Sequence, residues 1–426
     1  MCGRGGDLLS RRYYSLYVVR LTPIRPLLAI YVSDRKVGNT LGFVARLICL
    51  ISLFITMLSE RTSMSKPEVK DLSDEELEFY SRQIVLPDIG YNGQLKLRNA
   101  RVCIVGLGGL GSPAALQLTA MGVGYLRLID RDVVELSNLQ RQHLYSVNFL
   151  GYPKVEVAAK RLRELNPNIE IEPLPLSLNV DNAEDVVRDV DVVVDGLDRM
   201  TPRYALNRAC VKLGVPYVFG AAIMTFGNVS TIMPGKTPCL ECFQGNLDDA
   251  TLPTCAVVGV HPSILSIIAS VEVSEAMRII LGDKPHLANK ILHCDIGDMK
   301  FDEVEISKAE NCPVCGSKPS GSPMPLKQKL VTEVCGREGK KVFVITPRRK
   351  LELDMDELYS FLKNNGFKVR VKADLGLTFN GGLNGTASIL KSGIMIIEGA
   401  DNEKEAYDFY SKIVIDELKV SRSNIE

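Results

Sequence analysis

The chain has 426 residues, of which 46% are hydrophobic and 24% charged, with 51 Lys plus Arg against 51 Asp plus Glu. This length is enough for two or three domains, and the composition is that of a globular protein. The balanced charge gives no global electrostatic argument for binding nucleic acid or an anionic membrane, so neither is expected as a partner.

The N-terminal extension, residues 1–63, contains a basic irregular segment followed by an apolar run over 47–58. A membrane span needs about 20 apolar residues, so this run is short for one. It is interpreted either as a signal anchor or, preferably, as upstream sequence that precedes a start at Met64. A membrane is expected as a partner only if the run is genuine. The capping box Ser73–Glu76, with Leu72 and Leu77 as a hydrophobic staple, predicts a helix just after Met64.

A glycine-rich turn follows the predicted strand 102–105 and precedes a predicted helix over about 113–121. Such a turn cradles phosphates against helix N-terminal amides and the positive end of the helix dipole. Gly106 is expected to make the tight turn, Gly108 to let a phosphate approach the backbone, and Gly111 to let the helix lie close to the sheet. The predicted nucleotide site contains Gly106, Gly108, Gly109 and Gly111.

A second strand, 125–129, ends on Asp130, which lies 19 residues after Gly111 and is suited to accept hydrogen bonds from ribose hydroxyls. Helices and strands then alternate, which predicts a Rossmann-like, doubly wound α/β sheet with ligands at the carboxyl ends of the strands. The later predicted strands are 169–171, 190–194, 215–219 and 229–233, and the predicted helices are 154–165, 203–213 and 262–281.

Two Cys-x-x-Cys pairs lie about 70 residues apart, at Cys239 and Cys242 and at Cys312 and Cys315. Four thiolates match tetrahedral zinc, and since no ligand position is left open the site would be structural. Paired metal-type cysteines also favour a reducing, cytoplasmic location over a disulfide framework.

A linker rich in Ser, Pro and Gly is predicted at 317–325, and residues 326–426 are expected to form a separate small α+β domain. Its predicted strands are 328–333, 341–345, 367–371 and 393–397, and its predicted helices are 354–364 and 403–418. Residues 64–316 would then form the nucleotide-binding domain with its zinc site. The small domain is expected to help dock a protein partner.

Several charged residues accompany the nucleotide cradle: Arg82, Arg141, Lys154 and Asp198. Each alone would be an ordinary surface charge, but together the cations could neutralise a triphosphate. Asp198, just beyond a predicted strand, could hold Mg²⁺, which prefers one or two carboxylates plus phosphate oxygens. A nicotinamide dehydrogenase would not need this combination, so Mg·ATP is the favoured ligand.

These motifs together resemble the E1-like activating enzymes of the MoeB/ThiF/HesA group. The resemblance covers about residues 73–316 and is carried by 80–83, 106–111, 130–142, 151–154, 195–198 and the two cysteine pairs. It implies ATP-dependent adenylation of the C-terminal glycine of a ubiquitin-fold sulfur carrier that ends in Gly-Gly, of the MoaD, ThiS or Urm1-like kind.

The resemblance also implies roles for individual residues. Asp130 would hold ribose, Asn138, Arg141 and Lys154 would contact phosphates, and Asp198 would bind Mg²⁺. Arg82 would reach into the partner subunit's site of a homodimer. The family often has Thr and Asn on either side of the magnesium aspartate, where this chain has Leu197 and Arg199.

Cys255 lies in a loop outside both zinc pairs. Relatives carry a cysteine here that attacks the acyl-adenylate or takes part in sulfur transfer, so Cys255 is a candidate nucleophile, with an unreactive loop cysteine as the alternative.

Two other functions remain open from the sequence. One is a related ATP-dependent enzyme of the tRNA threonylcarbamoyladenosine dehydratase kind, although that branch typically lacks the cysteine pairs. The other is a nicotinamide oxidoreductase or a non-catalytic dinucleotide-binding module. The expected carrier would serve thiamine synthesis, molybdopterin synthesis, tRNA thiolation or protein modification.

Overall fold

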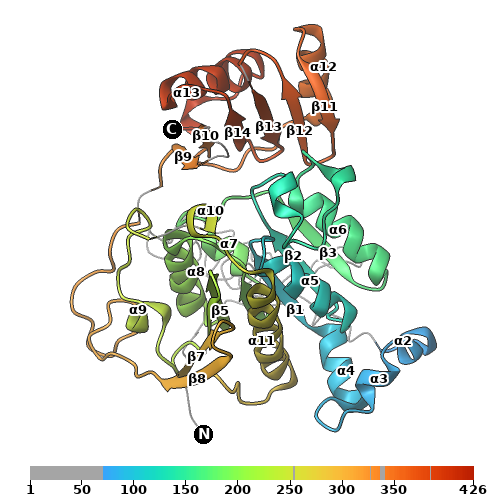
Figure 1. Ribbon diagram of the computed structural model, residues 1–426, viewed down its shortest axis with the longest axis vertical. Coiled ribbons are helices and arrows are strands. Elements are labelled where there is room, and N and C mark those ends of the chain that lie inside the picture. Colours follow the sequence, from blue (N-terminus) through green and yellow to red (C-terminus); the bar gives the residue numbers. More distant parts are fainter. Residues whose placement is uncertain (1–70, 253–254, 327, 336–340, 384) are drawn as a thin grey trace, which may run out of the picture. The chain divides into compact units, whose positions relative to one another are not determined.

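The computed structural model describes residues 71–426 except 253–254, 327, 336–340 and 384 (Figure 1). The expectations for residues 1–63 lie outside the described residues. The predicted capping box is confirmed at the start of α2 (Asp74–Phe79), where the Ser73 hydroxyl accepts from the Glu76 amide and the Glu76 carboxylate accepts from the Ser73 amide. Among the described residues no helix is both long and apolar enough to cross a membrane.

The larger sheet has eight strands in the order β3-β2-β1-β4-β5-β6-β7-β8. The first five strands are parallel and the last three run antiparallel. The parallel part, with β1 between β2 and β4, is the predicted doubly wound arrangement. The strands are β1 (Arg101–Val105), β2 (Tyr125–Ile129), β3 (Glu170–Leu174), β4 (Val192–Asp195), β5 (Tyr217–Ile223), β6 (Phe226–Ile232), β7 (Lys290–Asp295) and β8 (Lys300–Glu305).

Helices cover both faces of this sheet (Figure 1). Residues of α4, α5, α6 and α11 share a core with one face, and residues of α7 and α8 share a core with the other. Because the central strands are covered on both sides, every residue of β4 is buried, and its three valines form a continuous apolar run that ends at Asp195. The helices are α3 (Ser81–Ile84), α4 (Gly90–Asn99), α5 (Gly111–Ala120), α6 (Lys154–Leu165), α7 (Ala183–Val187), α8 (Met200–Leu213), α9 (Leu240–Phe243), α10 (Cys255–Val258) and α11 (Pro262–Leu281), with short turns η1 (Leu136–Asn138) and η2 (Val147–Phe149).

A six-stranded antiparallel sheet, in the order β11-β12-β13-β14-β10-β9, forms the C-terminal part. Its strands are β9 (Val331–Cys335), β10 (Lys341–Ile345), β11 (Lys368–Lys372), β12 (Gly376–Asn380), β13 (Thr386–Leu390) and β14 (Met395–Glu398). Its helices are α12 (Met355–Asn364) and α13 (Glu403–Ser411), followed by the turns η4 (Lys412–Glu417) and η5 (Arg422–Asn424).

The two faces of the six-stranded sheet have different partners. One face shares a core with α12 and α13. On the opposite face, Val344, Leu390 and Ile394 form a small apolar cluster with Val133, a residue from the loop that follows β2. The C-terminal sheet therefore packs directly against a loop at the carboxyl edge of the larger sheet.

Candidate functional site

The carboxyl edge of the larger sheet brings the predicted nucleotide residues together. In the register of the parallel strands, Val105 at the end of β1 pairs with Ile129 of β2 and with Asp195 of β4. The glycine turn, Asp130 and the 195–198 loop therefore leave the sheet side by side. The first and third touch, since a Cβ on Gly106 would lie 2.4 Å from the carbonyl oxygen of Gly196.

The glycines of the turn have the different geometries that the sequence predicts. Gly106 has φ +91°, a conformation that other residues rarely adopt. A Cβ on Gly111 would lie 1.8 Å from the Gly106 carbonyl oxygen, and one on Gly109 would lie 2.5 Å from the Leu265 side chain on α11. At Gly108, in contrast, the atom nearest to an added Cβ would be the side-chain nitrogen of Gln142, 3.8 Å away. The backbone at Gly108 is therefore the open part of the turn.

Gly108→Ala and Gly111→Ala are expected to fail in different ways. The Gly108 variant should keep the melting temperature of the wild-type protein but weaken ATP binding at least about tenfold, because its methyl group occupies the space a phosphate needs. The Gly111 variant should lose several kcal/mol of stability, because the methyl group meets fixed backbone. Thermal denaturation and ATP titration calorimetry check both; equal ATP affinity in wild type and Gly108→Ala contradicts the prediction.

Asp130 holds the glycine turn to the loop that follows β2. Its carboxylate accepts hydrogen bonds from the backbone amides of Leu107 at 2.7 Å and Asp132 at 2.7 Å. Burial raises the pKa of Asp130, although the positive charge of Lys154 opposes the rise. Asp130 thus fixes the shape of the turn, a role that sequence reasoning missed beside the expected ribose contact.

Lys154, the first residue of α6, is almost fully buried and points its ammonium group at Asp132, with 3.0 Å between Nζ and Oδ2. Burial acts against the charged form of Lys154, yet its pKa is raised because Asp132 and Asp130 both favour the cation. A charged amine is thus held at the edge where the glycine turn lies. Sequence reasoning missed Asp132, although the alternation Asp130-Arg131-Asp132 after a strand was a signal for it.

Asn138 and Arg141 belong to one turn. The side-chain oxygen of Asn138 accepts a hydrogen bond from the Glu135 backbone amide at 3.2 Å. The backbone carbonyl of Asn138 accepts one from the Arg141 backbone amide at 3.0 Å. The guanidinium of Arg141 donates to the Ser137 carbonyl at 2.7 Å. The turn is tied to the glycine loop, since Tyr145 donates from its hydroxyl to the Leu107 carbonyl at 2.9 Å. Asn138 therefore shapes the segment that carries Arg141.

Asp198 lies beyond β4 on an exposed loop and makes no hydrogen bond or ion pair within the described residues. The loop itself is held by a buried network. The Asp195 carboxylate accepts from the Leu197 amide and from the Arg203 guanidinium, and Arg203 donates further to the carbonyls of Leu197 and Gly220. Sequence reasoning missed this network, which leaves the Asp198 carboxylate available for a ligand.

The two remaining candidate residues are Arg82 and Cys255. Arg82 is exposed on α3 and makes no hydrogen bond or ion pair within the described part of the chain. Cys255 is the first residue of α10, but its side chain lies outside the described residues. Their predicted roles, in a partner subunit's site and as a nucleophile, stay predictions.

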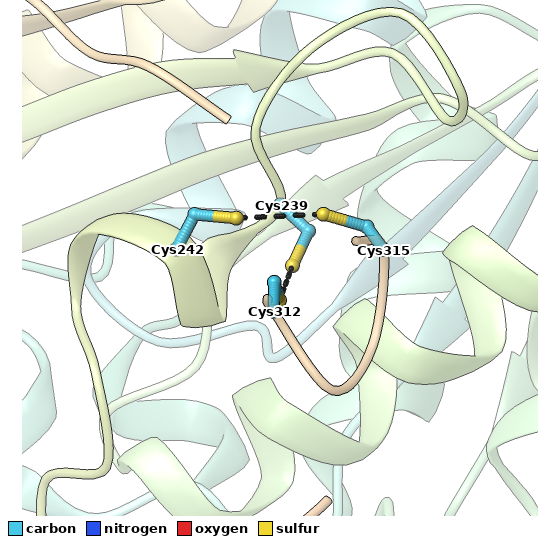
Figure 2. Close-up of side chains that lie close together, drawn as sticks. All are labelled: Cys239, Cys242, Cys312 and Cys315. Carbon is cyan, nitrogen blue, oxygen red and sulfur yellow. Dashed lines mark hydrogen bonds between the residues drawn. The ribbon is translucent and has the colours of Figure 1, made fainter. Parts of the chain in front are cut away.

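The four cysteines of the predicted zinc site meet in space. Their sulfur atoms all lie within 4.8 Å of one another, and the separations are 3.7 Å between Cys239 and Cys312 and 3.4 Å between Cys242 and Cys315 (Figure 2). Ligands about 2.3 Å from a tetrahedral zinc ion lie about 3.8 Å apart, so the sulfur cluster fits this ion.

The loop that carries the second cysteine pair, Cys312 and Cys315, is tightly packed. Gly316 donates from its amide to the Cys312 carbonyl at 3.0 Å, and a Cβ at Gly316 would lie 2.5 Å from that same oxygen. A residue with a side chain therefore does not fit after Cys315 without shifting the loop. The donor set and this tight turn agree with the predicted closed, structural site.

The comparison with protein families decides what kind of protein this is: the model of the ThiF family matches residues 80–314. The chain belongs to the ThiF family. The match spans the glycine turn, Asp130, Lys154 and Asp198, and the fold is that of an E1-like adenylyltransferase.

Curated relatives agree with the family. The chain is 39% identical to the "Sulfur carrier protein adenylyltransferase" of Thermus thermophilus over 252 residues, which cover 58% of this chain and 93% of that protein. It is 39% identical to the "SAMP-activating enzyme E1" of Haloferax volcanii over 246 residues, which cover 58% of this chain and 91% of that protein. It is also 39% identical to the "Adenylyltransferase and sulfurtransferase MOCS3" of Drosophila grimshawi, of which it covers 62%.

Solved structures share the fold. A crystal structure of Escherichia coli MccB with MccA-N7isoASN matches with a TM-score of 0.52 and 25% identity, covering 56% of this chain and 74% of that one. A second, of MccB with succinimide, matches with a TM-score of 0.51 and 27% identity over 56% of this chain and 74% of that one.

Proposed function

We propose that this protein uses ATP to adenylate the C-terminal glycine of a ubiquitin-fold sulfur carrier. One observation supports this proposal most: the open glycine turn, Lys154 and Asp198 lie at one edge of the sheet in a chain of the ThiF family. The carrier's carboxylate attacks the α-phosphate of ATP, a P–O bond to the acyl group forms, and pyrophosphate leaves. This chemistry needs no protein nucleophile; it needs two anions positioned and their developing charge neutralised.

The proposed roles follow from position. Asp130 holds the ribose, the amides of the glycine turn and Asn138 hold phosphates, and Arg141 and Lys154 neutralise them. Asp198 provides a carboxylate for Mg²⁺, which would bridge phosphate oxygens. Beside it, Arg199 replaces the family's usual Asn.

We also propose a homodimer, a bound zinc ion, a division into domains and a cellular location. Arg82, exposed and without an ion pair within the described residues, would act in the site of a second copy in a homodimer. Zinc would bind Cys239, Cys242, Cys312 and Cys315 and stabilise the fold. We propose 64–316 as the adenylation domain, 317–325 as a linker and 326–426 as a second domain, and a cytoplasmic location that keeps the thiols reduced.

ATP–pyrophosphate exchange with each carrier of the host that ends in Gly-Gly tests the proposal. Exchange that appears only when a carrier is present supports it, and exchange with none of them refutes it. Carrier-independent ATP turnover in the presence of tRNA would favour the threonylcarbamoyladenosine dehydratase alternative, and tight NAD binding without ATP binding would favour an oxidoreductase.

Cys255→Ala is expected to leave ATP–pyrophosphate exchange unchanged, because adenylation uses no protein nucleophile. It should reduce a later step, the transfer of sulfur to the adenylated carrier, if the thiol attacks the acyl-adenylate. Exchange and thiocarboxylate formation, followed by mass spectrometry of the carrier, separate the two steps. A variant with wild-type rates in both assays would leave Cys255 an unreactive loop residue.

A further inference from the structure

The hairpin formed by β11 and β12 in the C-terminal sheet contacts the start of α6. The carboxylate of Glu156, two residues after Lys154, accepts hydrogen bonds from the backbone amides of Asp374 at 3.2 Å and Leu375 at 2.8 Å. These amides lie in the turn between the two strands. One side chain of the nucleotide-binding part therefore binds two backbone donors of a hairpin turn.

The same hairpin contacts the residues just before Lys154. The Thr378 hydroxyl on β12 donates to the Gly151 carbonyl at 2.6 Å. A Cβ on Gly376 would lie 2.9 Å from Pro153 Cγ, so the strand lies directly against the proline. The hairpin thus touches the chain on both sides of Lys154.

The segment under the hairpin is paired with the loop that follows β2. Val134 donates to the Tyr152 carbonyl at 2.8 Å, Gly151 donates to the Val134 carbonyl at 2.9 Å, and Lys154 donates to the Asp132 carbonyl at 3.0 Å. Between these bonds, Val133 is covered by Val344, Leu390 and Ile394 of the C-terminal sheet. The C-terminal sheet therefore packs against both loops that carry the Lys154–Asp132 pair.

Gly151 lies at the turn that leads into this segment. Its φ is +84°, a conformation in which few other residues are stable, and it lies three residues before Lys154. With the hairpin absent, Gly151 would keep only its bonds to the neighbouring loop. The contacts of Glu156 and Thr378 add to these loop bonds at the two ends of the 151–156 segment.

We propose that the β11–β12 hairpin is a positioning element of the nucleotide site, with Glu156 and Thr378 as its positioning residues and Lys154 as the group they place. This inference rests on the proposed function and extends it to the C-terminal domain, which becomes a fixed part of the site. Misplacing a catalytic group by about 1 Å reduces turnover by up to about 100-fold, so small shifts of Lys154 would be measurable.

The test uses the full-length chain and the variants Glu156→Ala, Thr378→Val and Glu156→Gln. The matched control is Glu164→Gln, a carboxylate in the last turn of the same helix whose side chain is half exposed and forms an ion pair with Arg161. Glu156→Ala is expected to lower kcat for ATP–pyrophosphate exchange by about 10- to 100-fold while changing the KM for the carrier little. Glu156→Gln keeps one acceptor oxygen and should recover part of the loss.

Hydrogen–deuterium exchange gives a readout independent of activity. The amides of 132–134, 151–152 and 154–156 should exchange with deuterium faster in Glu156→Ala and Thr378→Val than in wild type, whereas Glu164→Gln should match wild type. Unchanged amide exchange in these segments overturns the inference. Faster deuterium exchange with an unchanged kcat for ATP–pyrophosphate exchange also overturns it, since the hairpin would then be a structural contact only.

The two proposals fail in distinguishable ways. Wild-type protein that shows no exchange activity with any carrier refutes the proposed function. In that case the affinity for Mg·ATP and the deuterium exchange of the amides still test the inference. Wild type and Glu156→Ala with equal Mg·ATP affinity and equal deuterium exchange would refute the positioning role.

Discussion

Lys154→Met is expected to lower ATP–pyrophosphate exchange by about 100- to 1,000-fold, the loss typical when one group that stabilises developing charge is removed. Lys154 is almost fully buried at the edge where the glycine turn opens, and the neighbouring carboxylates keep it charged by raising its pKa. Methionine has a similar length and can occupy the same space, so the loss reports the charge rather than a cavity.

The variant should stay folded. Removing one partner of a fully buried ion pair costs about 3–5 kcal/mol, but the Asp132 side chain is 48% exposed, so water can solvate its charge and the loss is smaller. Circular dichroism melting checks this. Lys160→Met, an exposed lysine of the same helix, is the matched control and should keep wild-type exchange. A Lys154 variant with more than about half of the wild-type rate would remove Lys154 from the proposed site.

Cys312→Ser is expected to release the zinc and to lower the melting temperature by about 10 °C or more, because the binding free energy of a structural zinc ion is part of the folding free energy. Cys312 is buried in the cluster, so serine places a poor ligand where a thiolate is needed. Metal content by plasma mass spectrometry and thermal denaturation check the prediction. The same fall in melting temperature should follow treatment of wild type with a chelator and should reverse with added zinc.

Cys294→Ala is the control for zinc content. Cys294 is a buried cysteine of β7 outside the cluster, so the variant should still hold one zinc per chain even if a core contact is lost. Full zinc content in Cys312→Ser, or an unchanged melting temperature after the metal is removed, would contradict a structural zinc site.

The central parallel strands β1, β4 and β5 were predictable because they are largely buried and contain continuous apolar runs. The predicted helices at 154–165 and 262–281 agree with α6 and α11, which have amphipathic patterning or clear end signals such as Pro262 and Gly282. The strands β7 and β8 were missed. Every residue of β8 is exposed, and four of its six residues are charged, so the strand has no apolar pattern to detect.

In the C-terminal sheet the strands β12 and β13 were missed for a different reason. Both begin or end near glycines, and β12 mixes Thr and Asn with apolar residues, which is also typical of a loop. The residues of the candidate site were largely predictable because strand ends of a parallel sheet converge at one edge. The supporting groups Asp132, Arg203 and Glu156 were not, because their partners lie in other segments and depend on the tertiary packing.

The bonds from the hairpin turn to Glu156 join residues 218 and 219 positions apart in the sequence. A ribosome adds about 5–20 residues per second, so about 10–45 seconds separate the synthesis of the two ends. During this interval the eight-stranded sheet is being completed while its outermost loops still lack their last contacts. We therefore expect a nascent chain truncated before residue 374 to fold its glycine turn and yet turn over ATP poorly, so that activity appears only once the chain is nearly complete.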